Sequence, residues 1–220
     1  MSFNIKQKRA FQTIISGIRL SGYGNKSIRF LTLTTSLLCK NSEFFEKGSL
    51  NNDFQILKKR ICRYSPHRLV SEGYISSQKA KSVYRSEKYF KNFNFEYFKV
   101  ETSEGNGVLH ILYRGSYLPY SFLVDNWQTI HNSWDLNIKK IDTSKPKDSA
   151  LYVVTQYISS QSSSYVRNSQ SWNWVFRGFK QIWYKFARDY RSNCIELWEK
   201  YLKKYSLNKF YQQKSLSDFG

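Results

Sequence analysis

Apolar positions along the chain predict four strands. Residues 27–35 (SIRFLTLTT) are dense in β-branched and apolar residues, which is typical of a strand in the middle of a sheet. Two further strands are predicted at 94–102 and 107–114, and the Asn-Gly step between them is a strong hairpin signal. Alternation of apolar and polar residues over 134–141 predicts the fourth strand.

Three helices are predicted between and after these strands. Apolar residues recur at spacings of three and four after Asn51, after Pro119 and after Asp148, and each of these residues suits the start of a helix. The order is then strand, helix, strand pair, helix, strand, helix. We therefore expect an α+β fold, with a small antiparallel-rich sheet and helices on one face.

The two ends of the chain differ from this central region. The first 29 residues contain six basic residues and no acidic one, which predicts a basic N-terminal arm over residues 1–26. The central domain is expected at 27–164. Over 165–220 we expect a basic, aromatic-rich helical extension, because apolar residues from Trp172 to Tyr190 follow helical spacing. Its apolar stripe is expected to pack on the central domain.

The net charge indicates a polyanionic partner. The chain has 35 Lys and Arg against 16 Asp and Glu, a formal charge of +19, which exceeds what solubility requires. Aromatic residues make up 18% of the chain and offer stacking surfaces for a single strand, although an AT-rich genome explains their abundance equally well. The residues expected to contact nucleic acid are Lys6, Lys8, Arg9, Arg29, Arg177, Lys180 and Arg188.

Other partner classes fit the sequence less well. No stretch of about 18 uncharged apolar residues is present, so we expect no membrane insertion. The three cysteines are widely spaced and include no CxxC pair, which favours an intracellular, reducing compartment. An AT-rich plasmid, virus or organelle genome is the expected source.

Three residues suggest chemistry. If the hairpin loop has an even number of residues, Glu101 and His110 share one face of the sheet and can approach one cation. Tyr157 lies beside the core positions of the last helix and overlooks the sheet, whereas Tyr152 is expected to point away. The alternative is that His110 is an ordinary core histidine, Glu101 a surface residue at a strand end and Tyr157 a half-buried tyrosine.

In their order, these segments resemble the motifs of the HUH endonuclease superfamily, the rolling-circle replication initiators and their relatives. In that family a first strand reads much like FLTLT, found here at 30–34. A second motif reads as Glu, a short turn, Gly-Val and His-hydrophobic-His, and ETSEGNGVLHIL at 101–112 is similar. The last motif is a helix with a tyrosine followed by a polar residue, as in YVVTQYISSQ at 152–161.

The resemblance implies an HUH/ferredoxin-like fold and a replication initiator that nicks single-stranded or hairpin DNA. Tyr157, with Tyr152 as the second candidate, would attack the phosphate to give a 5′-phosphotyrosine and a free 3′-hydroxyl. Glu101 and His110 would hold Mg²⁺ or Mn²⁺, and no organic cofactor is expected.

The chain departs from the family pattern at two positions. Leu112 stands where the second histidine of the pair belongs, so His131, Asp135 or water has to complete the metal site. Gln161 replaces the usual lysine after the tyrosine. The alternative function is therefore a non-catalytic basic module that binds DNA or RNA.

Overall fold

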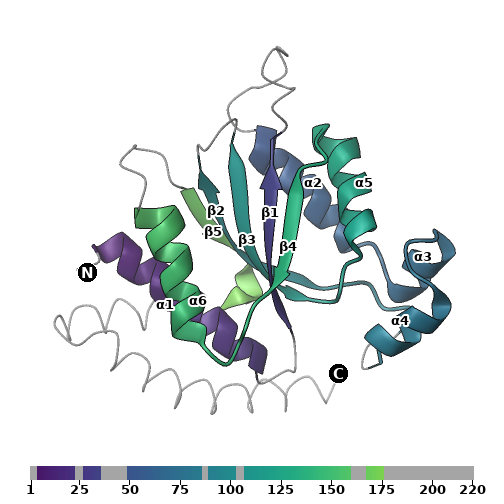
Figure 1. Cartoon of the computed structure of the whole chain (residues 1–220), viewed down its shortest axis with the longest axis horizontal. Coiled ribbons are helices and arrows are strands. Elements are labelled where there is room, and N and C mark those ends of the chain that lie inside the picture. The colour runs from purple at the N-terminus through teal and green to yellow at the C-terminus, as the bar shows by residue number, and fades with distance from the viewer. Residues whose placement is uncertain are drawn as a thin grey trace.

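The protein is described by a computed structural model that covers residues 4–22, 27–35, 49–85, 89–102, 107–159 and 167–175. Its centre is a five-stranded sheet in which every pair of neighbouring strands is antiparallel (Figure 1). In sheet order the strands are β4 (Leu136–Lys140), β1 (Ile28–Thr34), β3 (Val108–Gly115), β2 (Phe95–Thr102) and β5 (Arg167–Gln170). The predicted α+β class is confirmed at this level.

Helices connect and cover these strands. They are α1 (Ile5–Gly22), α2 (Ser49–Ile61), α3 (Pro66–Ser71), α4 (Ser77–Val83), α5 (Tyr120–His131), α6 (Pro146–Val153), the π-helical η2 (Val154–Ser159) and the 3₁₀ turn η3 (Trp172–Trp174). Within the described part of the chain, none of the helices has the length and apolar character that crossing a bilayer needs.

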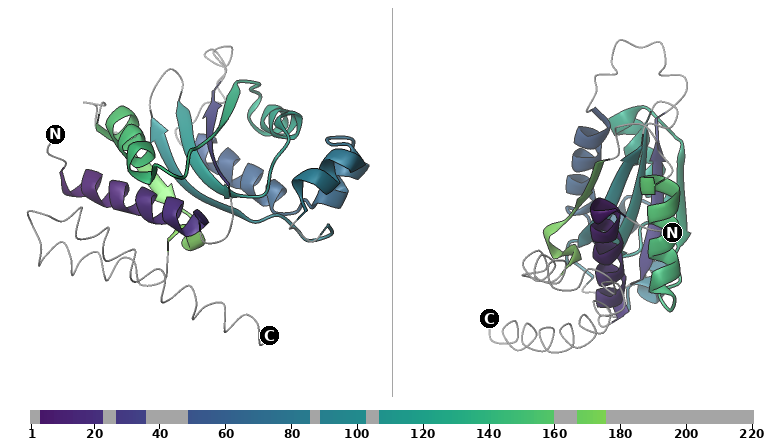
Figure 2. Two further views of the ribbon diagram at one scale, coloured as in Figure 1. Left: turned by 60° about the horizontal axis from the view of Figure 1, so that its bottom comes forward. Right: turned by 90° about the vertical axis from the view of Figure 1, so that its left-hand side faces the viewer.

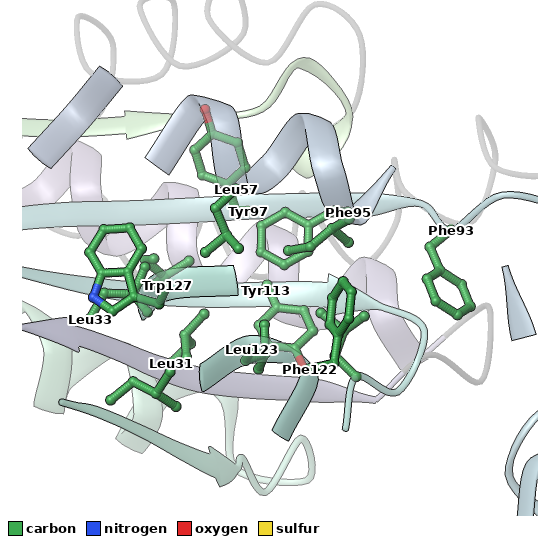
Figure 3. Packing of buried hydrophobic residues seen from close by; sticks show 14 of the residues in the cluster. Leu31, Leu33, Leu57, Phe93, Phe95, Tyr97, Tyr113, Phe122, Leu123 and Trp127 are labelled. Atoms are coloured by element: carbon green, nitrogen blue, oxygen red, sulfur yellow. The ribbon is translucent and has the colours of Figure 1, made fainter. Parts of the chain in front are cut away.

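Both faces of the sheet are covered, so the expectation of helices on one face is wrong. Leu31 and Leu33 of β1 point to one face, where α2 and α5 pack over a cluster rich in aromatic rings (Figure 3). Ile28 and Phe30 point to the other face, which α1 and α6 cover. We call these the α2 face and the α1 face. The dense apolar run of β1 has this cause, because a strand covered on both sides carries apolar residues on both faces.

The expected basic arm is instead a helix of the core. Phe11, Ile14, Ile15 and Ile18 of α1 are at most 5% exposed and pack in the α1-face cluster. Helix α1 lies beside α6 on this face (Figure 2). Their spacing of three and four marks one side of a helix. The prediction of a solvated arm rested on the basic residues of this segment. Burial of the apolar side of the helix determines its position instead.

The start of the predicted C-terminal helix is also different. Residues 167–170 form strand β5 on β2, and η3 follows, so the expected long helix is wrong for 167–174. Trp174 is fully buried in the α1-face cluster, although the predicted apolar stripe did not include it. Arg177, Lys180 and Arg188, which were expected to contact nucleic acid, lie outside the described residues.

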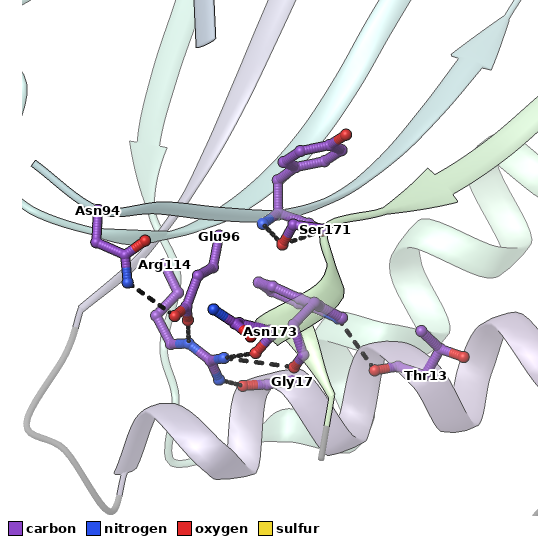
Figure 4. Close-up of polar contacts among 9 residues, drawn as sticks. Thr13, Gly17, Asn94, Glu96, Arg114, Ser171 and Asn173 are labelled. Atoms are coloured by element: carbon purple, nitrogen blue, oxygen red, sulfur yellow. Dashed lines mark hydrogen bonds and ion pairs between the residues drawn. The ribbon is translucent and has the colours of Figure 1, made fainter. Parts of the chain in front are cut away.

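A buried arginine joins three parts of the chain on the α1 face. Nε of Arg114 lies 2.6 Å from Oε2 of Glu96, while its other nitrogens donate to the carbonyl oxygens of Gly17 and Asn173, each at 2.7 Å (Figure 4). Arg114 is 5% exposed, so its charge is compensated by protein groups rather than water. Strands β2 and β3, the end of α1 and η3 are thereby tied together.

Trp174 completes this junction. Its indole nitrogen donates to the carbonyl oxygen of Thr13 at 3.1 Å. The ring lies so close to α1 that a Cβ added at Gly17 would overlap with it. Gly17 is therefore required for the close approach of α1 to η3.

We expect Arg114→Leu to lower the free energy of unfolding by about 3–5 kcal/mol, because it leaves the carboxylate of Glu96 buried without its partner. Urea unfolding followed by circular dichroism measures this. The double variant Glu96→Leu/Arg114→Leu should recover part of the stability, since it removes both charges. If the double variant were destabilised by the sum of the two single effects, the pair would not act as a unit.

Candidate functional site

Two tyrosine hydroxyls meet on the α1 face. Helix α6 runs into the π-helical segment η2, and Oη of Tyr152 lies 3.2 Å from Oη of Tyr157. In a continuous α-helix, residues five apart would point about 140° away from each other. In a π-helix the hydrogen bonds join residues that are five apart, so two side chains at this spacing lie on the same side of the helix. The expectation that Tyr152 points away from this site is therefore wrong.

Tyr157 overlooks the sheet, as predicted. Its ring stacks on the imidazole of His110, with centroids 3.7 Å apart and planes inclined by 20°. Phe30 of the neighbouring strand stacks on both rings, at 5.8 Å from Tyr157 and 5.9 Å from His110. Tyr152 meets Phe30 edge-on at 6.5 Å and remains 52% exposed. The pair thus rests on a fixed aromatic base while one hydroxyl-bearing ring faces solvent.

His110 is neutral at physiological pH. Its side chain is buried between the sheet and η2, and this burial lowers its pKa to about 4. Removing a charged imidazolium from water is costly, so burial favours the neutral form. His110 therefore holds the ring of Tyr157 by stacking and adds no positive charge to the site.

The predicted pairing of Glu101 with His110 is wrong. The register places Glu101 opposite Leu109 and Val100 opposite His110, with Thr102 and Val108 as the last pair. Residues 103–107 separate these last partners, so the connection contains an odd number of residues. Adjacent residues of a strand point to opposite faces, and Glu101 consequently lies on the α2 face.

His131 lies on the α2 face as well, at the end of α5. Its Nδ1 lies 2.7 Å from Oδ2 of Asp53, and its Nε2 lies 2.9 Å from Oγ1 of Thr35. Trp127 stacks on the imidazole at 4.4 Å. Thr35 is 1% exposed, so this chain of hydrogen bonds fixes α2 and α5 to the end of β1. No sequence pattern predicts it, because Thr35 and His131 are 96 positions apart.

The residues expected to hold a metal ion are therefore not assembled. Glu101 and His131 are separated from His110 by the sheet, and Leu112 is buried beside Phe30 in the α1-face cluster. Among the described residues, no group of three or more His, Cys, Asp or Glu side chains could hold a metal ion. The donor set that the family resemblance implies does not fit this site.

The predicted nucleic-acid contacts divide between the two faces. Lys6, Lys8 and Arg9 belong to α1, which packs against α6 and η2, and Lys6 is exposed. Arg29 lies on the α2 face instead, with its guanidinium 5.3 Å from the ring centroid of Tyr117. The α1 side thus carries cations beside the elements that present the tyrosine pair.

Lys139 of the edge strand β4 is a further cation near this site, which the sequence pattern did not indicate. It pairs with Phe30 in the register and is exposed, so it lies on the α1 face beside the aromatic base of the tyrosine pair. Asn137 occupies the equivalent position opposite Thr32. Alternation along β4 assigns both residues to this face, which becomes clear once the pairing with β1 is known.

The depressed pKa of His110 predicts a pH-dependent stability. Between pH 6.5, the ordinary value for histidine, and about pH 4, the unfolded chain binds more protons at this position than the folded chain. Stability should fall as pH decreases through this window, by at most about 3 kcal/mol from this group. His110→Leu should flatten this part of the profile in urea titrations. An unchanged slope would show that the imidazole is not buried as described.

Comparison with family models, with curated proteins and with solved structures gives no match, so the interpretation of the site rests on its own geometry.

Proposed function

We propose that the chain binds single-stranded or hairpin DNA and cleaves it by transferring a phosphodiester onto a tyrosine of the pair. The observation that carries this proposal is the 3.2 Å contact between the hydroxyls of Tyr152 and Tyr157 above His110. A net charge of +19 supports a polyanionic substrate. Tyr157 is the nucleophile in this proposal, because its ring is held by stacking on residues of both β1 and β3.

The reaction is a transesterification. The oxygen of Tyr157 forms a bond to phosphorus, and the bond from phosphorus to the 3′ oxygen breaks, so one phosphodiester replaces another. The hydroxyl proton of Tyr157 passes to solvent, and the leaving 3′ oxygen takes up a proton. A hydrogen bond donated by Tyr152 stabilises the negative charge that develops on the attacking oxygen. Lys139 and the cations of α1 favour the approach of the phosphate.

Mg²⁺ or Mn²⁺ would polarise the phosphate in the family that the sequence resembles. Because Glu101, His110 and His131 do not converge, the proposed step uses the tyrosine pair and the surrounding cations.

A second function is favoured by a specific observation. Leu112 fills the position of the second histidine and is 1% exposed within the apolar cluster of the α1 face. A core residue at this position suits a module that binds nucleic acid without cleaving it. The two candidates share their ligand and differ in whether a covalent product forms.

The test is a covalent adduct. Incubation of the protein with labelled single-stranded or hairpin DNA should give a protein–DNA band that survives denaturing electrophoresis. Tyr157→Phe should abolish the band. Tyr152→Phe should slow its formation by roughly 10-fold to 100-fold, because a hydrogen bond to a charged group contributes about 1.5–3 kcal/mol.

Tyr120→Phe is the matched control, since Tyr120 is 54% exposed on α5, which covers the α2 face. This variant should behave as the wild type. An adduct that persists in Tyr152→Phe/Tyr157→Phe would exclude the tyrosine pair. Tight binding without an adduct on any substrate, with or without Mg²⁺ or Mn²⁺, would establish the binding module.

A further inference from the structure

Two short helices stand apart from the covered sheet. After α2 the chain forms α3 and α4 and returns to β2 through residues 89–94 (Figures 1 and 2). We call residues 63–85 and 89–92 the α3–α4 lobe. In Figure 1 this lobe lies on the opposite side of the sheet from α6, which presents Tyr152. The lobe therefore offers a surface separate from the tyrosine pair.

The lobe exposes a large aromatic ring. Phe90 is 74% exposed, which is more than the other exposed large hydrophobic residues of the described chain. The imidazole of His67 lies beside it, with ring centroids 4.9 Å apart and planes inclined by 35°. Tyr89 meets both rings edge-on, at 5.3 Å from Phe90 and 5.7 Å from His67. Two neighbouring rings at the surface form a platform on which a base can stack.

The backbone holds this platform in place. The amide of His67 donates to the carbonyl oxygen of Tyr89 at 3.1 Å, and the amide of Phe93 donates to the carbonyl oxygen of Tyr64 at 2.7 Å. Phe93 is itself buried and stacks on Tyr84 at 5.6 Å. The segment that carries Phe90 is thus fixed on both sides, while the ring of Phe90 remains at the surface.

The platform is surrounded by positive charge. The described residues of the lobe include six exposed cations, which are Arg63, Arg68, Lys79, Lys81, Arg85 and Lys91. The acidic residue among the described residues of the lobe is Glu72, whose carboxylate lies 2.7 Å from both Nε of Arg68 and Oη of Tyr64. The remaining cations have no carboxylate of the described lobe to neutralise them, so this surface attracts anions.

We propose that the α3–α4 lobe binds single-stranded nucleic acid, with a base stacked on Phe90 and with phosphates on Lys79 and Lys81 of α4. A flat exposed ring among cations matches the alternation of bases and phosphates along a strand. An acidic peptide would use the cations and leave the ring without a function. The inference rests on the proposed function for its choice of ligand and adds a second point of contact on the strand.

The experiment measures fluorescence anisotropy of a labelled single-stranded oligonucleotide in the full chain with Tyr157→Phe, so that no adduct forms. In this background Phe90→Ala should weaken binding by roughly 5-fold to 150-fold, the effect of removing one stacked base. Val83→Ala removes another exposed apolar side chain of the lobe, 38% exposed on α4, and should leave the affinity unchanged.

An abasic oligonucleotide of the same length separates stacking from charge. On this strand Phe90→Ala should have no effect, because there is no base to stack. Lys79→Ala/Lys81→Ala should weaken binding to both strands and reduce the slope of log affinity against log salt by about 0.7 for each phosphate that the variant no longer neutralises. Phe90→Leu, which keeps an apolar side chain but cannot stack, should bind the normal strand like Phe90→Ala. Unchanged binding of the abasic strand by both variants excludes a folding defect as the cause.

The proposal would be overturned if Phe90→Ala and its parent protein bound the oligonucleotide that keeps its bases with equal affinity. So would competition by polyglutamate that matches competition by unlabelled DNA, since that result would indicate an acidic protein partner. These readouts are independent of cleavage. A loss of binding in Phe90→Ala together with no adduct in the wild type would refute the tyrosine reaction and support the lobe, and the reverse pattern would refute the lobe alone.

Discussion

The burial of the sheet on both faces is the constraint on which the rest of the structure depends. Each strand residue points to one of the two faces of the sheet. The register of β2 with β3 determines which residues of these two strands lie on the same face. His110 consequently lies beside Phe30 on the α1 face, whereas Glu101 lies on the α2 face. The buried pair of Arg114 and Glu96 then fixes α1 and η3 on the face that carries the tyrosines.

The change from α-helix to π-helix brings the two tyrosine hydroxyls together on this face. Without it, Tyr152 and Tyr157 would point in different directions, and one hydroxyl could not support the other. The neutral imidazole of His110 provides a flat support for the ring of Tyr157, the proposed nucleophile. Exposed cations lie on α1, on β4 and on the α3–α4 lobe. Under the proposed function, the lobe binds the strand at a distance from the tyrosine pair that reacts with it.

Much of the fold could be predicted from apolar spacing. The dense apolar run of β1 and the helical periods after Asn51, Pro119 and Asp148 correspond to elements of the structure. The expectation that Tyr157 overlooks the sheet is confirmed, because its ring stacks on His110 and its neighbours Val154 and Ile158 pack in the α1-face cluster. What could not be predicted depends on small differences: one residue in the hairpin connection moves Glu101 to the other face, and one π-helical segment turns Tyr152 toward Tyr157. Neither the length of the hairpin connection nor the π-helical segment could be predicted from the spacing of apolar residues.

Identification of the residue that becomes linked to DNA tests the central claim most directly. After incubation with a short oligonucleotide, the protein is digested with trypsin and its peptides are fragmented by mass spectrometry. The peptide of residues 148–167, which contains Tyr152, Tyr157 and Tyr165, should carry the mass of a phosphonucleotide on Tyr157. The same modification on Tyr165, or on a residue outside this peptide, would contradict the assignment of the tyrosine pair as the reacting group.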